Sequence, residues 1–288
     1  MPLSDIIPII WSSRFLANLD KALIYGNAAN RDYQPDATYG SAINVHRFGD
    51  VTVGDYLKNT DIASPETLSV DRYVISLDQQ KYFNFFIDSI DEIQSQPNLL
   101  DKAMQRAAYA VADVADQHVA SLHAEAGNVL GTPAAPVVPI VTDIYAYLTD
   151  MAKMLDESNV PVTDRFLIMD PAGIKLLKDS GEMLSDTPAG DTVRAYGVFN
   201  APGSLPMGYK GHVAGFDLFM SNNTPTDDAA TSVWQAGHPD GISYVDSFNK
   251  LSGYQPESLF GEAMKGLYVF GAKVTSPASL VSVYTALA

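Results

Sequence analysis

The feature that most constrains the fold is a helical stretch, residues 98–126, that contains neither glycine nor proline. Pro97 precedes it and Gly127 follows it, and these are typical start and stop residues of a helix. Apolar or weakly polar residues recur in it at three- and four-residue steps and predict one continuous stripe: Leu100, Met104, Ala107, Val111, Val114, His118 and Leu122. At about 1.5 Å per residue this helix reaches roughly 43 Å, which is long for a compact domain of this size.

The residues before the helix predict a wide β-hairpin over 46–80. Polar and apolar residues alternate from Val51 to Tyr56 and again from Leu68 to Leu77, on either side of a polar tip at 58–66. A lone two-stranded ribbon is marginal in water, so we expect it to rest on a neighbouring molecule. Residues 1–45, with one predicted helix at 12–25, have too few apolar residues to fold alone and are expected to form an arm.

The remainder of the chain predicts alternating helices and strands. A second helix begins at 142 or 143, with Ile144, Leu148, Met151 and Leu155 on one face. A buried strand is predicted at 165–169, and Asp170 and Pro171 then form the start of a further helix. Other strands are predicted at 215–222, 267–275 and 279–286. Both chain ends flank the middle section, which indicates two lobes with one inserted into the other.

Composition excludes several classes of protein. The 288 residues are 47% hydrophobic and 18% charged, which is typical of a globular chain. The net charge of −16, with only 18 scattered basic residues, argues against a surface that grips polyanions. The absence of cysteine excludes disulfides and thiolate chemistry. No apolar run is long enough to span a membrane, and the N-terminus lacks the features of a signal peptide.

No catalytic constellation emerges from the motifs. His118 and His123 lie five residues apart on one helix, so their side chains diverge and a shared metal is disfavoured. An acidic turn at Asp88, Asp91 and Glu92 has the residue types for acid–base work, but such a turn before a helix is more simply solvated charge. Two further sets are assigned structural roles: Asp113 and Asp116 on the wet side of the long helix, and Tyr82, Phe83, Phe85 and Phe86 in core packing.

Several phrases, taken in order, are similar to a known family. They are IIPIIWSSRFLANLDKALIYGNAANRDY, VISLDQQKYFNFFIDSIDEIQSQPNLLDKAMQRAAYAVADVADQHVASL, NVPVTDRFLIMDPAGIKLL, GHVAGFDLFMSNNTP and SLFGEAMKGLYVFGAKVTSPASLV. Together these segments resemble the major capsid proteins of tailed bacteriophages, the HK97-fold family. The resemblance spans most of the chain, and the order and spacing of the phrases give it its specificity.

The resemblance implies an α+β, HK97-like capsid fold. Residues 1–45 would be the N-arm and 46–80 the extended loop; 81–140 with 255–288 would form the peripheral domain around the spine helix, and 141–254 the axial domain. The residues expected to contact neighbouring subunits are Trp11, Phe15, Val51, Val53, Tyr56, Lys58, Leu68, Val70 and Tyr73. Some family members cross-link through lysine, but Lys58 near the loop tip is more simply a solubilising residue.

The implied function is self-assembly into the icosahedral head shell of a tailed phage, without catalysis, cofactor or metal. The implied partners are copies of the chain as pentamers and hexamers, a scaffolding protein, a portal and, in some members, a decoration protein. Assembly would take place in the host cytoplasm, and the virion would hold the DNA without sequence-specific binding. Two alternatives stay open: an encapsulin-like nanocompartment shell, and an enzyme of unknown class that uses Asp88 and Glu92.

Overall fold

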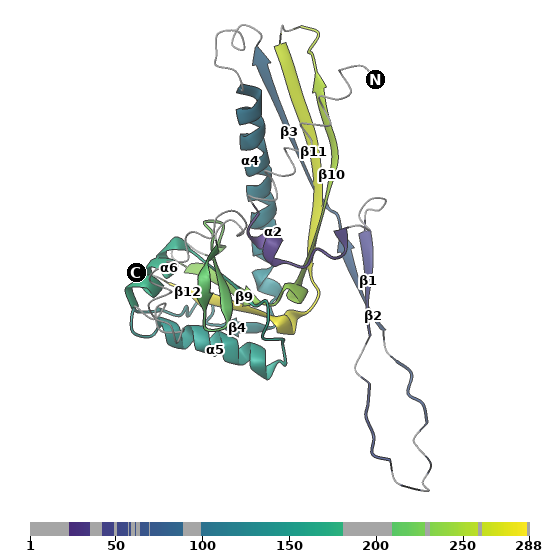
Figure 1. Cartoon of the computed structure of the whole chain (residues 1–288), viewed down its shortest axis with the longest axis vertical. Coiled ribbons are helices and arrows are strands. Elements are labelled where there is room, and N and C mark those ends of the chain that lie inside the picture. Colours follow the sequence, from purple (N-terminus) through teal and green to yellow (C-terminus); the bar gives the residue numbers. More distant parts are fainter. Residues whose placement is uncertain are drawn as a thin grey trace.

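The computed structural model describes most of the chain. The described residues are 23–34, 42–48, 51–56, 58, 61, 64–68, 70–88, 99–180, 209–227, 231–258 and 261–286. They form two bodies and a projecting loop (Figure 1). The bodies are named here the helix–sheet body and the seven-stranded body.

The helix–sheet body consists of a long helix beside a tall antiparallel sheet (Figure 1). The helix, α4 (Leu99–Ser121), continues into a 3₁₀ turn, η2 (Leu122–Glu125), which confirms the helix predicted at 98–126. The three strands of the tall sheet follow the order β10-β11-β3. Their bounds are Ile242–Tyr254 for β10, Gly261–Val274 for β11 and Gln79–Asp88 for β3.

The buried face of α4 differs in part from the predicted stripe. Alanine dominates it, and small side chains let the helix approach the sheet closely; the buried apolar members are Met104, Ala108, Val111, Ala112, Ala115, Val119 and Ala120. Val114, which the periodicity placed in the stripe, is 37% exposed. Asp116 was placed on the wet side, and this was wrong, because it is only 1% exposed. The predicted stripe was wrong in part because alanine is only weakly hydrophobic, so a face built mainly from alanine is hard to recognise in the apolar pattern.

The seven-stranded body has a mixed sheet in the order β4-β12-β9-β5-β7-β6, with β8 paired to β9. The strands are β4 (Asn128–Leu130), β5 (Phe166–Met169), β6 (Tyr209–Val213), β7 (Phe216–Met220), β8 (Thr226–Asp227), β9 (Thr231–Gly237) and β12 (Leu280–Thr285). Two helices, α5 (Ile144–Glu157) and α6 (Pro171–Ser180), cover one face. The other face packs toward α4, so β5 is buried on both sides.

The local signals in the seven-stranded body are confirmed. The four predicted residues of α5, from Ile144 to Leu155, are fully buried. The Asp170 side chain accepts a hydrogen bond from the Gly173 N–H at 3.0 Å, as expected of a helix N-cap, and Pro171 begins α6. The indole of Trp234 donates to the same Asp170 oxygen at 2.8 Å, so the cap also ties α6 to the sheet.

Three strands, β4, β10 and β12, cross the domain boundaries that the sequence suggested. β10 falls inside the range assigned to the axial domain, yet it pairs along its length with β11 of the helix–sheet body. β12 falls in the range assigned to the peripheral domain, yet it pairs with β9 and β4 of the seven-stranded body. The 3₁₀ turns η4 (Pro239–Gly241) and η5 (Pro277–Ser279) mark the crossings at β10 and β12.

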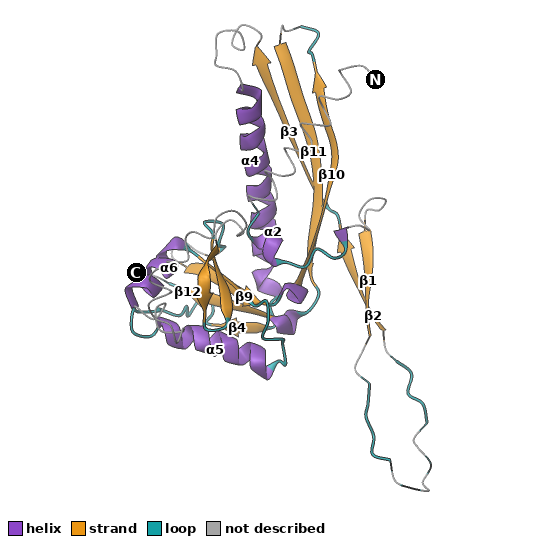
Figure 2. Ribbon diagram, in the orientation of Figure 1, coloured by secondary structure: helices purple, strands orange, loops and turns teal. Residues whose placement is uncertain are grey.

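The extended loop projects from the base of the helix–sheet body (Figure 2). Its two strands, β1 (Ala42–Phe48) and β2 (Val70–Ser76), pair antiparallel, as the predicted hairpin requires. At its root, Ile43, Val45, Ile75 and Leu77 pack with Val245 and Val269 of the tall sheet. A side chain at Gly271 would collide with the Ser76 carbonyl oxygen, so glycine there permits this close approach.

A short segment of the predicted arm lies on the chain's own body. Only residues 23–34 of this region, with 42–45, belong to the described chain; most of the helix expected at 12–25 lies outside it. The short helix α2 (Tyr25–Ala28) packs against α4, with Leu23 and Tyr25 almost completely buried. The expectation that all of 1–45 is an arm is therefore wrong for residues 23–34.

Candidate assembly surfaces

The extended loop presents apolar side chains that the chain itself leaves uncovered. The exposed fractions are 64% for Val51, 93% for Val53 and 70% for Tyr56 on the outgoing side. Leu68 and Val70 on the return side are about half exposed, and Lys58 at the tip is exposed. These six residues of the sequence-predicted contact set thus lie together on one open loop. Trp11 and Phe15, from the same set, lie outside the described residues.

Tyr73 differs from the other predicted contact residues. It is half-buried, lies opposite Val45 in the hairpin and packs against the apolar cluster at the loop root. Its ring therefore holds the loop to its own body. The alternation of the hairpin could not separate these roles, because it does not show where the ribbon leaves the sheet.

A second open apolar surface, which we name the sheet face, lies on the tall sheet. Alternation along β3 points Phe83 and Phe85 into the core, whereas Tyr82 and Phe86 are 81% and 38% exposed. Leu267, directly opposite Tyr82, is also 38% exposed. The core role assigned to all four aromatic residues from 82 to 86 is thus wrong for two of them. The alternation of successive residues between the two faces of a strand was the sequence signal that could have separated Tyr82 and Phe86 from Phe83 and Phe85.

The seven-stranded body carries a third apolar stretch beside its edge strand β4. Its apolar side chains are exposed: Val138, Ile140 and Val141. The preceding residue, Val137, forms backbone hydrogen bonds to Tyr284 and Ala286, next to the end of β12. The stretch therefore lies along the rim of the sheet.

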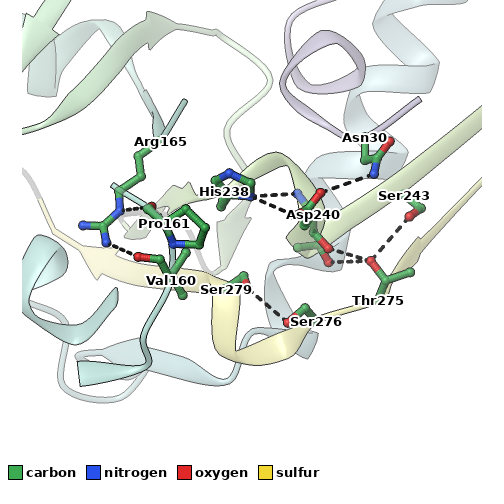
Figure 3. A network of polar contacts seen from close by, with 11 residues as sticks. Asn30, Val160, Pro161, Arg165, His238, Asp240, Ser243, Thr275, Ser276 and Ser279 are labelled. Carbon is green, nitrogen blue, oxygen red and sulfur yellow. Dashed lines mark hydrogen bonds and ion pairs between the residues drawn. The ribbon is translucent and has the colours of Figure 1, made fainter. Parts of the chain in front are cut away.

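A polar cavity of about 400 Å³ lies where the loop root meets both bodies. Tyr73 and His46 of the loop line it, together with Asn159 after α5 and Ser276 in the turn between β11 and β12. Around it, Asp240 receives a long contact from the Asn30 amide at 3.4 Å, and its backbone carbonyl accepts from the Thr275 hydroxyl at 2.8 Å (Figure 3).

Arg165 anchors the opposite wall of this junction. Its guanidinium donates to the carbonyls of Val160 and Pro161 at 2.6 and 2.8 Å (Figure 3). The same group forms an ion pair with Asp156 at 2.7 Å. Because the guanidinium is only 3% exposed, it fixes the turn after α5 as a charge-assisted clasp. The hydrogen bonds around the cavity join parts of one chain and give it a structural role.

The groups considered for chemistry do not converge in the described part of the chain. Asp88 ends β3 and pairs through its backbone with Gly261, whereas Asp91 and Glu92 lie outside the described residues. Within the described residues, no three His, Asp or Glu side chains gather in a way that could hold a metal ion.

Both histidines of α4 and η2 have packing roles. The His118 ring meets Phe270 edge-on at 5.6 Å between ring centres, and burial lowers its pKa below the ordinary value. His123 meets Tyr284 at 5.9 Å and contacts the Ala120 carbonyl at 3.1 Å. Both side chains are half-buried.

Comparison with known proteins gives the family. A family model described as phage capsid protein matches residues 73–283. No curated protein sequence matches the chain. Searching the described helices for a segment long and apolar enough to cross a membrane finds none.

Solved structures share the fold. One from Mycobacterium phage Che8 has 24% identity and a TM-score of 0.70, over 91% of this chain and 90% of that chain. The capsid of cyanophage P-SCSP1u has 19% identity and a TM-score of 0.68, over 93% and 89%. A virus-like particle from Pyrococcus furiosus has 12% identity and a TM-score of 0.54, over 94% and 96%. The chain belongs to the phage capsid protein family and is a shell-forming structural subunit with an HK97-like fold.

Proposed function

We propose that the chain assembles into the icosahedral head shell of a tailed phage by burying its extended loop on neighbouring copies. The observation that carries this proposal is the set of loop side chains left open, above all Val53 and Tyr56. Covering an exposed valine or leucine side chain fully is worth about 1.5–3 kcal/mol. A loop with several such residues is therefore stabilised strongly when another copy covers it.

The geometry favours head-to-tail contacts. The loop and the sheet face are different surfaces of one subunit, so the loop of one copy would lie on the sheet face of the next, near Tyr82 and Leu267. Such heterologous contacts close into rings when the rotation between copies is right. Obligate interfaces of this kind bury about 2,000 Å² or more. In this arrangement the seven-stranded bodies would form the axial domains of pentamers and hexamers.

The charge of the subunit suits storage of DNA. With a net charge of −16, the chain offers phosphate groups few partners. Several described cations are already paired: Lys153 with Glu157, Lys175 with Asp179 and Lys273 with Glu125. The shell would therefore enclose its genome without gripping it. We propose no catalytic turnover, with a scaffolding protein and a portal as partners, assembly in the host cytoplasm, and a decoration protein as an optional addition.

The test is to express the chain, alone and with its scaffolding protein, and to examine the products by sedimentation and negative-stain imaging. Shells are expected from the unaltered chain. The double variant Val53→Asp, Tyr56→Asp should yield unassembled subunits whose thermal unfolding is unchanged, because both side chains already face solvent. The proposal would be overturned if the unaltered chain stayed monodisperse and monomeric at high concentration, with or without the scaffolding protein.

Two controls make this test specific. Thr149→Asp adds a charge on the exposed side of α5 and should leave assembly intact. The conservative double variant Val53→Ile, Tyr56→Phe keeps the loop apolar and should still form shells. If the charged loop variant assembled as well as the unaltered chain, the loop would not be the contact surface.

The contents of the shells distinguish a phage head from an encapsulin-like nanocompartment. DNA-filled heads produced during infection would support the proposal of a phage head shell, whereas a co-purifying cargo enzyme would support a nanocompartment. The carboxylate alternative is tested by Asp88→Asn with Glu92→Gln. Loss of turnover of some substrate, with the fold intact, would favour an enzyme.

A further inference from the structure

Residues 23–34, which we name the strap, cross the helix–sheet body on two carboxylates. At the first, Asp116 of α4 accepts the backbone N–H groups of Ile24 at 2.8 Å and Gly26 at 3.1 Å. These donors open the short helix α2, and Ile24 at its N-cap has no side-chain acceptor to offer. Asp116 therefore caps α2 from another helix, supplying what the local sequence lacks.

At the second point, Asp246 of β10 acts as a hub for side chains. Its Oδ1 accepts from Arg31 at 3.0 Å and from Gln34 at 2.6 Å, and its Oδ2 accepts from the Tyr268 hydroxyl at 2.7 Å. Between the two points the strap backbone pairs with β10, since Asn30 N–H donates to Ile242 O and Tyr244 N–H donates to Asn30 O. The strap is thus held as an extra edge segment of the sheet.

The two anchors differ in how their charge is balanced. Asp246 faces the guanidinium of Arg31, so its negative charge has a cation beside it. Asp116 is 1% exposed, and no described lysine, arginine or histidine forms an ion pair with it. A buried carboxylate without a cation is costly in its ionised form and favours the protonated form.

From this geometry we propose that the strap is a proton-coupled latch: it closes on the helix–sheet body with uptake of one proton from solvent by the Asp116 carboxylate. Opening the strap returns the carboxylate to water, where it ionises and releases the proton. Raising the pH therefore loosens the strap while the two bodies stay folded. The latch concerns how firmly the strap itself is held on the helix–sheet body, which goes beyond the assembly function.

The groups that face Asp116 support the direction of the effect. Burial raises its pKa to about 7, the backbone N–H groups of the strap oppose this, and Asp113 on the same helix adds to it. Tyr25 of the strap and Tyr244 of β10 have phenols whose pKa values are raised further above their ordinary range by burial, so neither titrates near neutrality. Because the closed pKa exceeds the ordinary value of 3.8, closure weakens as pH rises from about 4 to about 7.

Hydrogen exchange of the full-length chain at pH 5 and pH 7.5, corrected for intrinsic rates, tests the latch. The protection of amides 24–29 should fall on the order of 10- to 100-fold between these pH values. Amides of α5, far from the strap, should keep their protection. Equal corrected protection of the strap at both pH values would overturn the proposal without any variant.

Three substitutions sharpen the result. Asp116→Asn should make strap protection independent of pH, whereas Asp246→Asn should lower it by a similar factor at both pH values. Asp113→Asn removes the neighbouring charge and should shift the midpoint of the pH response downward, which a purely structural role would not do. A pH response that survives in Asp116→Asn would refute the assignment; if that variant does not fold, the unaltered chain and Asp113→Asn decide. None of these readouts depends on shell formation, so failure of the latch is distinct from failure of the assembly proposal.

Discussion

The seven-stranded body and the extended loop treat their apolar side chains in opposite ways. In the body, residues such as Leu148, Trp234 and Val283 are completely buried by their own chain. In the loop, Val53 is 93% exposed and Tyr56 70% exposed, although their residue types are equally apolar. One region therefore completes its own core, whereas the other leaves apolar side chains uncovered, as the proposed contact with a neighbouring copy requires.

The largest expected effect breaks the self-contained side of this comparison. Trp234→Ala removes a fully buried indole and its hydrogen bond to the Asp170 cap. We expect a loss of about 3–5 kcal/mol in the free energy of unfolding, measured by urea denaturation of the unassembled subunit. Val162→Ala on the same body, at a side chain that is 68% exposed, should change it by less than about 0.5 kcal/mol. Similar losses in both variants would contradict the described core.

The next effect concerns the junction between the regions. Arg165→Ala leaves the carbonyls of Val160 and Pro161 without their charged donor. The expected cost is about 2–3 kcal/mol, seen as a lower denaturation midpoint. Asp156→Asn is the matched control and should cost less than about 1 kcal/mol, because its carboxylate is 60% exposed. An equal cost for the two would mean that the surface ion pair, and not the clasp, stabilises the turn.

A smaller effect sharpens the boundary within the loop itself. Tyr73→Ala removes a half-buried ring from the root cluster and should lower the stability of the subunit by about 1–2 kcal/mol. Val70→Ala, only three residues earlier but 49% exposed, should leave stability unchanged and instead weaken assembly. Thermal unfolding and sedimentation of both variants check the pair. If instead Val70→Ala lowered stability and Tyr73→Ala weakened only assembly, the part of the loop that packs on its own body would not begin between these two residues.

The smallest expected effect is a pH dependence inside the helix–sheet body. Burial lowers the pKa of His118, so the folded state favours the neutral ring against Phe270. This contribution is present above the ordinary value of 6.5 and is lost as pH falls below it. His118→Gln should reduce the decline in the free energy of unfolding between pH 7.5 and pH 5.5 by less than about 1 kcal/mol, seen as a smaller fall in melting temperature. An unchanged decline would assign that pH dependence to other groups.

Sequence reasoning succeeded where a signal is local. The period of Ile144, Leu148, Met151 and Leu155 predicted α5 and its buried face, and Asp170 followed by Pro171 predicted the start of α6. The hairpin alternation predicted the loop and most of its open residues. Such patterns depend on neighbours a few residues apart, so they can be read without knowing the fold.

The remaining features depend on contacts between distant parts of the chain. Asp116 resembles a solvent-facing helix residue until the N–H groups of Ile24 and Gly26, some ninety residues away, are placed beside it. The pairing of β10 with β11 and of β12 with β9 likewise rests on which strand meets which, and periodicity carries no such information. These long-range contacts explain why the domain boundaries and the strap could not be predicted.

The short connection 275–279 between β11 and β12 has a mechanical consequence for a closed shell. Its backbone is held from both sides, since Gly127 N–H donates to Pro277 O at 2.8 Å and Thr275 N–H donates to Gly241 O at 2.9 Å. Bending the subunit at this point would break those bonds. We therefore expect the two bodies to move as one rigid plate, so that in the proposed shell the difference in curvature between pentamers and hexamers is absorbed by the swing of the loop.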